Sequence, residues 1–136
     1  MLKWRNVVLC GILSALLICL VACQATVSGS KGGDRYELKR SKMMPNYWEV
    51  NVNKDVKPAY NAVLAGLKDL GLRISISKVD RLSGIVEGSF ADGKKFKITL
   101  AYESQGVTLM RIKAGLTGNK TLSVSLFQSI EKHFFK

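Results

Sequence analysis

The pattern of hydrophobic and polar positions divides the chain into three segments. Residues 7–22 are almost continuously apolar, residues 23–46 are polar and basic without a regular period, and residues 47–136 carry the periods of strands and helices. The pattern therefore predicts a leader over residues 1–22, a flexible basic tether over residues 23–46 and a single folded domain over residues 47–136.

Strand patterns dominate the predicted domain, because apolar residues recur there at every second position. In the first strand this alternation places Trp48 towards the core. Gly88 inside a strand indicates a bulge or close packing against a neighbour, and Asp92-Gly93 is typical of a two-residue type I′ hairpin turn. The predicted strands are residues 48–52, 72–76, 85–91, 96–102 and 110–114.

Two segments have the period of an amphipathic helix. The first runs from Val56 to Leu70, between Asp55 as N-cap and Gly71 as a left-handed stop. The second follows Asn119 and carries its apolar stripe to Phe134. The order β-α-β-β-β-β-α predicts an α+β fold with a twisted, mostly antiparallel sheet. Because each strand is apolar on one side only, we expect both helices on one face of the sheet.

The leader has the parts of an export signal. Lys3 and Arg5 precede the apolar run, and small residues precede Cys23. A membrane-spanning helix needs about 20 strongly apolar residues, whereas residues 7–22 are fewer and include a glycine and a serine. Cleavage is therefore favoured over a membrane span.

The motif Leu20-Val21-Ala22-Cys23 resembles the lipobox of bacterial lipoproteins. The resemblance implies a diacylglyceryl group on the Cys23 thiol and peptidase cleavage between Ala22 and Cys23, with acylation of the new amino group as a further step. Two or three acyl chains such as palmitate hold a protein on a membrane essentially permanently, whereas one gives reversible binding. The alternatives are an ordinary cleaved signal and an uncleaved anchor.

The resemblance to a lipobox also predicts the location of the protein. We expect the protein on the extracytoplasmic side of the membrane, anchored through its acyl chains. Gln24 stands where an aspartate would retain a lipoprotein in the inner membrane, so in a Gram-negative cell the expected place is the outer membrane, facing the periplasm.

The charge of the chain points to anionic partners. Its 21 basic and 10 acidic residues give a net charge of +11, and loss of Lys3 and Arg5 with the leader lowers this to +9. Such a protein is attracted to anionic surfaces. We expect an envelope protein or an anionic polymer and not nucleic acid, because the chain leaves the cytosol and no aromatic residues interleave with the cations as a base-stacking surface requires.

The sequence offers little catalytic or metal-binding chemistry. His133 is the only histidine and has no Cys, Asp or second His at ligand spacing. Ser125 and Ser129 are expected on the polar face of the last helix without a base nearby. Cys10 and Cys19 leave with the leader, so no disulfide is expected. We therefore expect a protein that is not an enzyme and has no metal or cofactor.

Three stretches resemble a family of small bacterial envelope lipoproteins classed as a domain of unknown function. They are "LAGLKDLGLRI", "SGIVEGSFADGKKFKITL" and "RIKAGLTGN", with their Leu-Gly turn, Asp-Gly hairpin and glycine-containing loop before the last helix. The chain departs from the family pattern at Lys120 and in its long basic tether. The resemblance implies an envelope lipoprotein, and the family has no catalytic residues to carry over.

Four cations form the candidate binding site. If the last two strands pair through the turn at residues 104–106, their outward positions form one basic solvent face, which could bind anions. The alternative is a solvated face that binds no partner. The four residues are Lys95, Lys97, Arg111 and Lys113.

Two functions are compatible with these patterns. The first is a non-enzymatic interaction module that docks envelope proteins or anionic polymers through this face or an exposed edge strand. The second is a carrier that holds an apolar ligand between helix and sheet. Its lining would be Tyr60, Phe96, Met110 and Phe127, although the same residues also suit a core.

Overall fold

The computed structural model describes residues 36–135. The predicted signal peptide, the cleavage site at Ala22 and Cys23, and residues 23–35 of the predicted tether lie outside the described residues. Among residues 36–135, no helix has the length and apolar character needed to cross a membrane.

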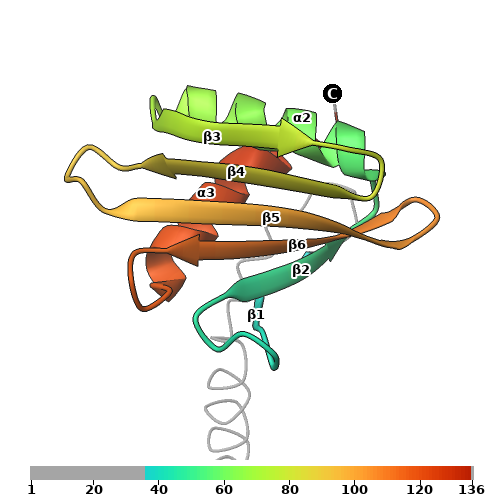
Figure 1. Cartoon of the computed structure of the whole chain (residues 1–136), viewed down its shortest axis with the longest axis horizontal. Helices are drawn as coiled ribbons and strands as arrows, with labels where there is room; N and C mark the ends of the chain where they lie inside the picture. Colours follow the sequence, from blue (N-terminus) through green and yellow to red (C-terminus); the bar gives the residue numbers. More distant parts are fainter. Residues whose placement is uncertain (1–35, 136) are drawn as a thin grey trace, which may run out of the picture. The chain divides into compact units, whose positions relative to one another are not determined.

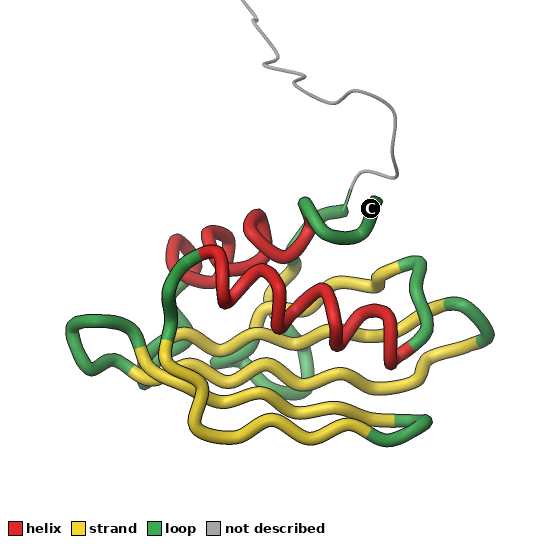
Figure 2. Tube along the Cα trace, turned by 90° about the horizontal axis from the view of Figure 1, so that it is seen from above, coloured by secondary structure: helices red, strands yellow, loops and turns green. Residues whose placement is uncertain are grey.

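The described chain forms a six-stranded antiparallel sheet with the strand order β1-β2-β6-β5-β4-β3. Both helices lie on the same face of this sheet, as Figures 1 and 2 show. The α+β fold predicted from the sequence is therefore confirmed, with one short strand added at the beginning. The elements are β1 (Lys39–Arg40), β2 (Trp48–Val52), α2 (Val56–Asp69), β3 (Arg73–Val79), β4 (Ser83–Ser89), β5 (Lys95–Ser104), β6 (Val107–Ala114) and α3 (Lys120–Glu131).

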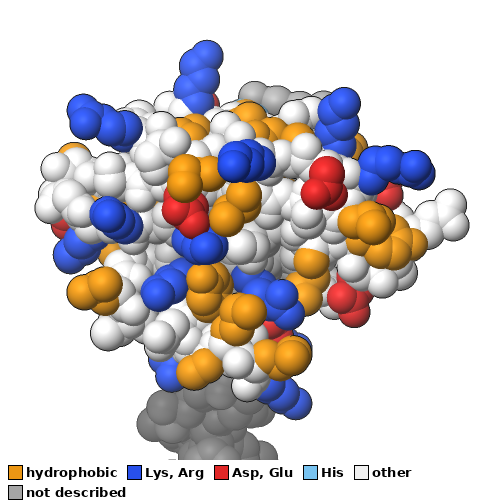
Figure 3. Space-filling model, viewed as in Figure 1, with side chains coloured by type: hydrophobic (Ala, Val, Ile, Leu, Met, Phe, Trp, Pro, Cys, Tyr) orange, Lys and Arg blue, Asp and Glu red, His pale blue; other side chains and the backbone are white. Residues whose placement is uncertain are grey.

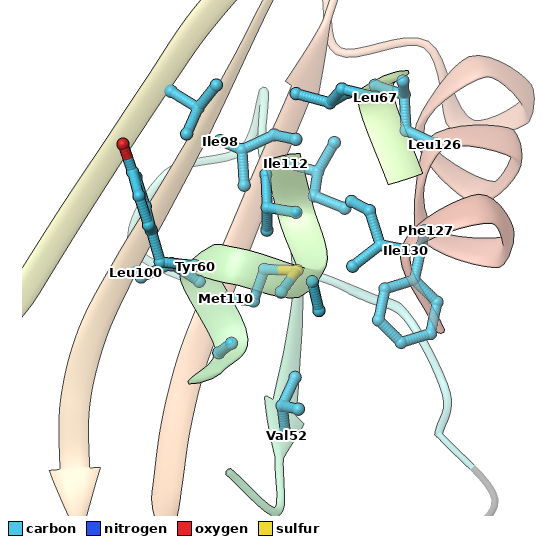
Figure 4. Packing of buried hydrophobic residues seen from close by; sticks show 14 of the residues in the cluster. Val52, Tyr60, Leu67, Ile98, Leu100, Met110, Ile112, Leu126, Phe127 and Ile130 are labelled. Atoms are coloured by element: carbon cyan, nitrogen blue, oxygen red, sulfur yellow. The ribbon is translucent and has the colours of Figure 1, made fainter. Parts of the chain in front are cut away.

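The core lies between the sheet and the two helices. In Figure 4, Met110 and Ile112 of β6 point towards Phe127 and Ile130 of α3, and all four are buried. The two helices approach each other closely at Gly66, where an added Cβ atom would lie 2.7 Å from the Cα atom of Ile130. Burying this cluster supplies the main stabilisation of the domain, at about 25 cal/mol per Å² of apolar surface.

The predicted tether is wrong over residues 36–46, which belong to the folded domain. The Tyr36 ring packs edge-on against Phe127 and Phe134, with centroids 6.0 and 5.6 Å away. Strand β1 then pairs with β2, and Ser41 is buried. The segment has no periodicity because single side chains, rather than a regular face, hold it to the domain.

The strand predicted over residues 72–76 is an edge strand, β3, in which every residue is exposed. Its pairing with β4 shifts between Ile74 and Ile76. Gly88 of β4 lies opposite this bulge, where an added Cβ atom would lie 2.1 Å from the Arg73 carbonyl oxygen. The prediction of close packing at Gly88 is therefore confirmed.

The predictions for the N-cap at Asp55 and for the Asp92-Gly93 turn are wrong in detail. Asp55 precedes α2 but makes no side-chain cap, and its carboxylate instead accepts a hydrogen bond from the Gly106 amide, 3.1 Å away in the β5–β6 turn. Only Gly93 of the Asp92-Gly93 pair has a positive φ, so the hairpin is not type I′. Phe90 and Lys94 instead close a three-residue loop through a 2.8 Å backbone hydrogen bond.

Candidate docking face of the sheet

One face of the sheet has no described helix over it. We call this the open face, and Figure 3 shows Lys and Arg side chains interspersed there with hydrophobic ones. The alternation of each strand directs its other side chains into the core, so these positions are half-buried or exposed. Its central residues are Glu49, Ile85, Glu87, Lys95, Lys97, Thr99, Ala101, Leu109, Arg111 and Lys113.

The strand register brings the four predicted cations onto this face. Lys97 lies directly opposite Lys113. Arg111 lies opposite Thr99, which is the next residue of β5 on the same face. Lys95 precedes Lys97 on the same side of β5. The predicted sharing of one solvent face by these residues is confirmed.

Two of the four cations have acidic partners. The Lys97 ammonium lies 3.0 Å from the Glu87 carboxylate on β4, and the Arg111 Nε lies 3.3 Å from Glu49 on β2. The hydrogen bond from Lys97 to Glu87 raises the pKa of Lys97 above its ordinary value. Glu49 is 62 positions from Arg111 in the sequence, so this pairing could not be seen without the sheet order.

The other two cations are free of acidic partners among the described residues. The Lys113 ammonium lies over the Tyr47 ring, 5.8 Å from its centroid, and Lys95 makes no ion pair. Exposed ion pairs contribute only about 0–1 kcal/mol. The two of these four cations that lack acidic partners therefore lie at the same end of the face.

A groove of about 1040 Å³ opens at this end, and we call it the basic groove. Lysines border it from two strands, while aromatic and aliphatic side chains supply apolar surface; Leu116 is 91% exposed. Such a lining suits a partner that carries negative charge together with apolar groups. Its main residues are Tyr47, Ile76, Glu87, Asp92, Lys94, Lys95, Phe96, Lys97, Lys113 and Leu116, and the two acidic residues lie beside Lys97 and Lys94.

The remaining candidate groups have structural roles. The His133 imidazole lies 2.5 Å from the Asp69 carboxylate and links the ends of α3 and α2. Ser129 was predicted on a polar helix face, but this is wrong: it is buried, and its hydroxyl donates to the Gly66 carbonyl oxygen at 2.8 Å. Within residues 36–135, no three His, Cys, Asp or Glu residues gather as a metal site would require.

Asp80 organises the turn between β3 and β4. Its carboxylate accepts hydrogen bonds from the amides of Leu82 and Ser83 and from the Ser83 hydroxyl, all within 2.9 Å. The Leu82 amide contributes most to holding the pKa of Asp80 below its ordinary value. This is the turn role expected of an aspartate at such a position.

The four residues proposed to line a carrier site belong to the core. Each is at most 8% exposed and packs in the same buried cluster. Figure 4 shows three of them, Tyr60, Met110 and Phe127, within this packing. Their placement gives the carrier hypothesis no support.

The sequence from residue 6 to residue 133 matches a family described as protein of unknown function (DUF3568). The chain belongs to this family. No curated protein matches the chain. The match spans the whole described domain except its last residues, so the open face and the edge strand β3 both lie within the family's pattern.

Proposed function

We propose that the chain is a lipid-anchored protein of the cell envelope that acts as a non-enzymatic docking module. The observation that carries this proposal is the uncovered sheet face, on which Lys95 and Lys113 stand without acidic partners. Helices cover the other face and bury its apolar side chains. The expected partner is anionic, an acidic surface of an envelope protein or an anionic envelope polymer.

The proposed location in the cell envelope depends on the motif that ends in Cys23. The family match begins at residue 6, inside the predicted leader, so it covers the residues that resemble a lipobox, up to Cys23. Lipidation at Cys23 would place the domain outside the cytosol, where anionic head groups, proteins and polymers are the available partners. The basic character of the chain, with a net charge of +11, is consistent with such partners.

Intact mass spectrometry of the protein extracted in detergent tests the anchor. We expect a mature chain that begins at Cys23 and carries acyl groups, and a Cys23→Ala variant that retains its leader. Recovery of the unaltered protein with residues 1–22 attached and a free thiol at Cys23 would contradict the proposal.

The open face is best tested with Lys95 and Lys113, the two predicted site cations that lack acidic partners. Replacing Lys95 and Lys113 by Glu reverses the local charge without breaking either ion pair, and neither side chain is in the core. The matched control replaces Lys57 and Lys68 by Glu on the exposed side of α2, which gives the same change in net charge.

Crosslinking in intact envelopes provides the measurement. We expect the Lys95→Glu, Lys113→Glu variant to lose the crosslinked species that the natural protein forms, while the α2 control keeps them. Added salt should weaken the interaction in the natural protein. Equal crosslinking by both variants would show that the open face does not bind the partner.

A further inference from the structure

The edge strand β3 offers a second surface, which adjoins the basic groove at Ile76. The sheet ends at β3, which pairs only with β4 among the described residues. It has 7 residues, whereas the opposite edge, β1, has 2. An edge of this length leaves a row of backbone N–H and C=O groups that a further strand can pair with.

The register shows which backbone groups point outward. Hydrogen-bonded and non-hydrogen-bonded pairs alternate along an antiparallel ladder. The Asp80 amide donates to the Ser83 carbonyl at 2.8 Å, so the Val79 and Ser77 positions fall on non-hydrogen-bonded pairs. Their N–H and C=O groups are therefore directed away from β4, towards the open edge.

The side chains of β3 have different chemistry on its two faces. Lys78 pairs with Ile85, and Arg73 pairs with Ser89, so both cations lie on the open face. Val79 and Ile74 lie on the helix-covered side, opposite Gly84 and Gly88, and each remains 37% exposed. A strand added here meets positive charge on one face and uncovered apolar surface on the other.

We propose that β3 binds an extended segment of a partner protein in which acidic residues alternate with apolar ones. The segment adds a seventh strand to the sheet. Its carboxylates lie beside Lys78, and its apolar side chains cover Val79, within the stretch of β3 that can pair regularly. The bulge between Ile74 and Ile76 limits regular pairing to Ile76–Val79, and the two cations disfavour a second copy of this basic chain as the occupant.

Strand addition would also cover an exposed apolar residue of β3. Ile76 is 40% exposed at the edge, between the two cations, where it would gain cover from an added strand. A polysaccharide or a lipid head group supplies carboxylates or phosphates but no row of amides matched to the outward groups of Ser77 and Val79. The geometry therefore favours a peptide.

The test uses the full chain in a non-ionic detergent and a fluorescent peptide of alternating valine and glutamate as long as β3. We expect saturable binding by fluorescence anisotropy, weakened by salt, and no binding of the matched valine–lysine peptide. The control peptide has the valines and glutamates in two blocks. Equal binding of all three peptides would overturn the proposal.

A proline at position 77 tests the backbone contact directly. Ser77→Pro removes an N–H that points away from β4, so the β3–β4 ladder stays intact. We expect affinity to fall about tenfold, the effect of roughly one lost backbone hydrogen bond plus the clash of the ring. Ser77→Ala, which keeps the N–H, should bind as the natural protein does. Unchanged affinity of the proline variant would exclude strand addition.

Two further arms cover the other outcomes. N-methylation of the peptide amides that face β3 should abolish binding, whereas methylation of the alternate amides should not, and this holds even if the proline variant misfolds. A concentration-dependent dimer that Ser77→Pro dissociates would identify a second copy as the occupant and overturn the proposal. The Lys95→Glu, Lys113→Glu variant should bind the peptide normally, which separates this proposal from that for the open face.

Discussion

The contact between the two helices makes a sharp prediction about stability. In the substitution Gly66→Ala, the new Cβ atom would lie 2.7 Å from the Cα atom and 2.8 Å from the backbone nitrogen of Ile130. These are backbone atoms, so no rotamer change can relieve the clash. Helices α2 and α3 have to move apart over the core that they cover.

Two effects of this substitution oppose each other. Alanine in place of a helical glycine favours the helix by about 1 kcal/mol. Overpacking of a core costs about 1–3 kcal/mol. Separation also lengthens the 2.8 Å hydrogen bond from the Ser129 hydroxyl to the Gly66 carbonyl, which adds about 0.5–1.5 kcal/mol. The clash outweighs the propensity, and we expect a net loss of about 2 kcal/mol.

Urea unfolding followed by far-UV circular dichroism measures this loss. For a domain of this size, 2 kcal/mol corresponds to a fall in Tm of about 8–16 °C. Ser129→Ala isolates the hydrogen bond, and Ala65→Gly on the same helix reports mainly the propensity. A Gly66→Ala variant as stable as the natural protein would refute the claim that close approach of the helix backbones requires glycine.

Four other substitutions test the fold and its dependence on pH. Asp80→Asn should lower the urea midpoint near neutral pH and converge with the natural protein below about pH 3.8, because a carboxylate with a lowered pKa stabilises the fold above its ordinary pKa and loses that contribution as acid protonates it. Trp48→Phe should cost about 1–3 kcal/mol in chemical unfolding, since it removes the buried 2.9 Å hydrogen bond from the indole to the Gly118 carbonyl. Gly88→Ala should increase hydrogen exchange of β3 amides, because its Cβ atom would collide with the carbonyl of the paired strand; unchanged protection would contradict this. Tyr36→Ala should expose the β1 segment to trypsin, seen as faster cleavage by mass spectrometry, because the ring holds this segment against the helix layer.

The elements of the domain could be predicted from the sequence because their signals are local. The helix expected over Val56–Leu70 is found over Val56–Asp69, and Gly71 has the left-handed φ of 65° that ends it. The one-sided alternation of the central strands also indicated that a single face of the sheet is covered. The same alternation placed Lys97 and Lys113 on the solvent side of their strands.

The two ion pairs of the open face could not be predicted from the sequence in this way. Glu49 and Glu87 reach Arg111 and Lys97 only because β2 and β4 flank the β5–β6 hairpin in the sheet. The sequence shows that each glutamate points outward but not which cation lies beside it. Only the sheet order therefore separates the paired cations from Lys95 and Lys113.

The amino-acid sequence alone determined the order of the elements and the sides of the strands that enter the core, since both depend on the spacing of neighbouring residues. The tertiary structure decided that Tyr36 belongs to the domain, that Asp55 binds the distant Gly106 amide and that β3 is the exposed edge. Each of these depends on contacts between residues far apart in the chain. Such contacts form only when the hydrophobic core fixes the strand order, and no local pattern encodes them.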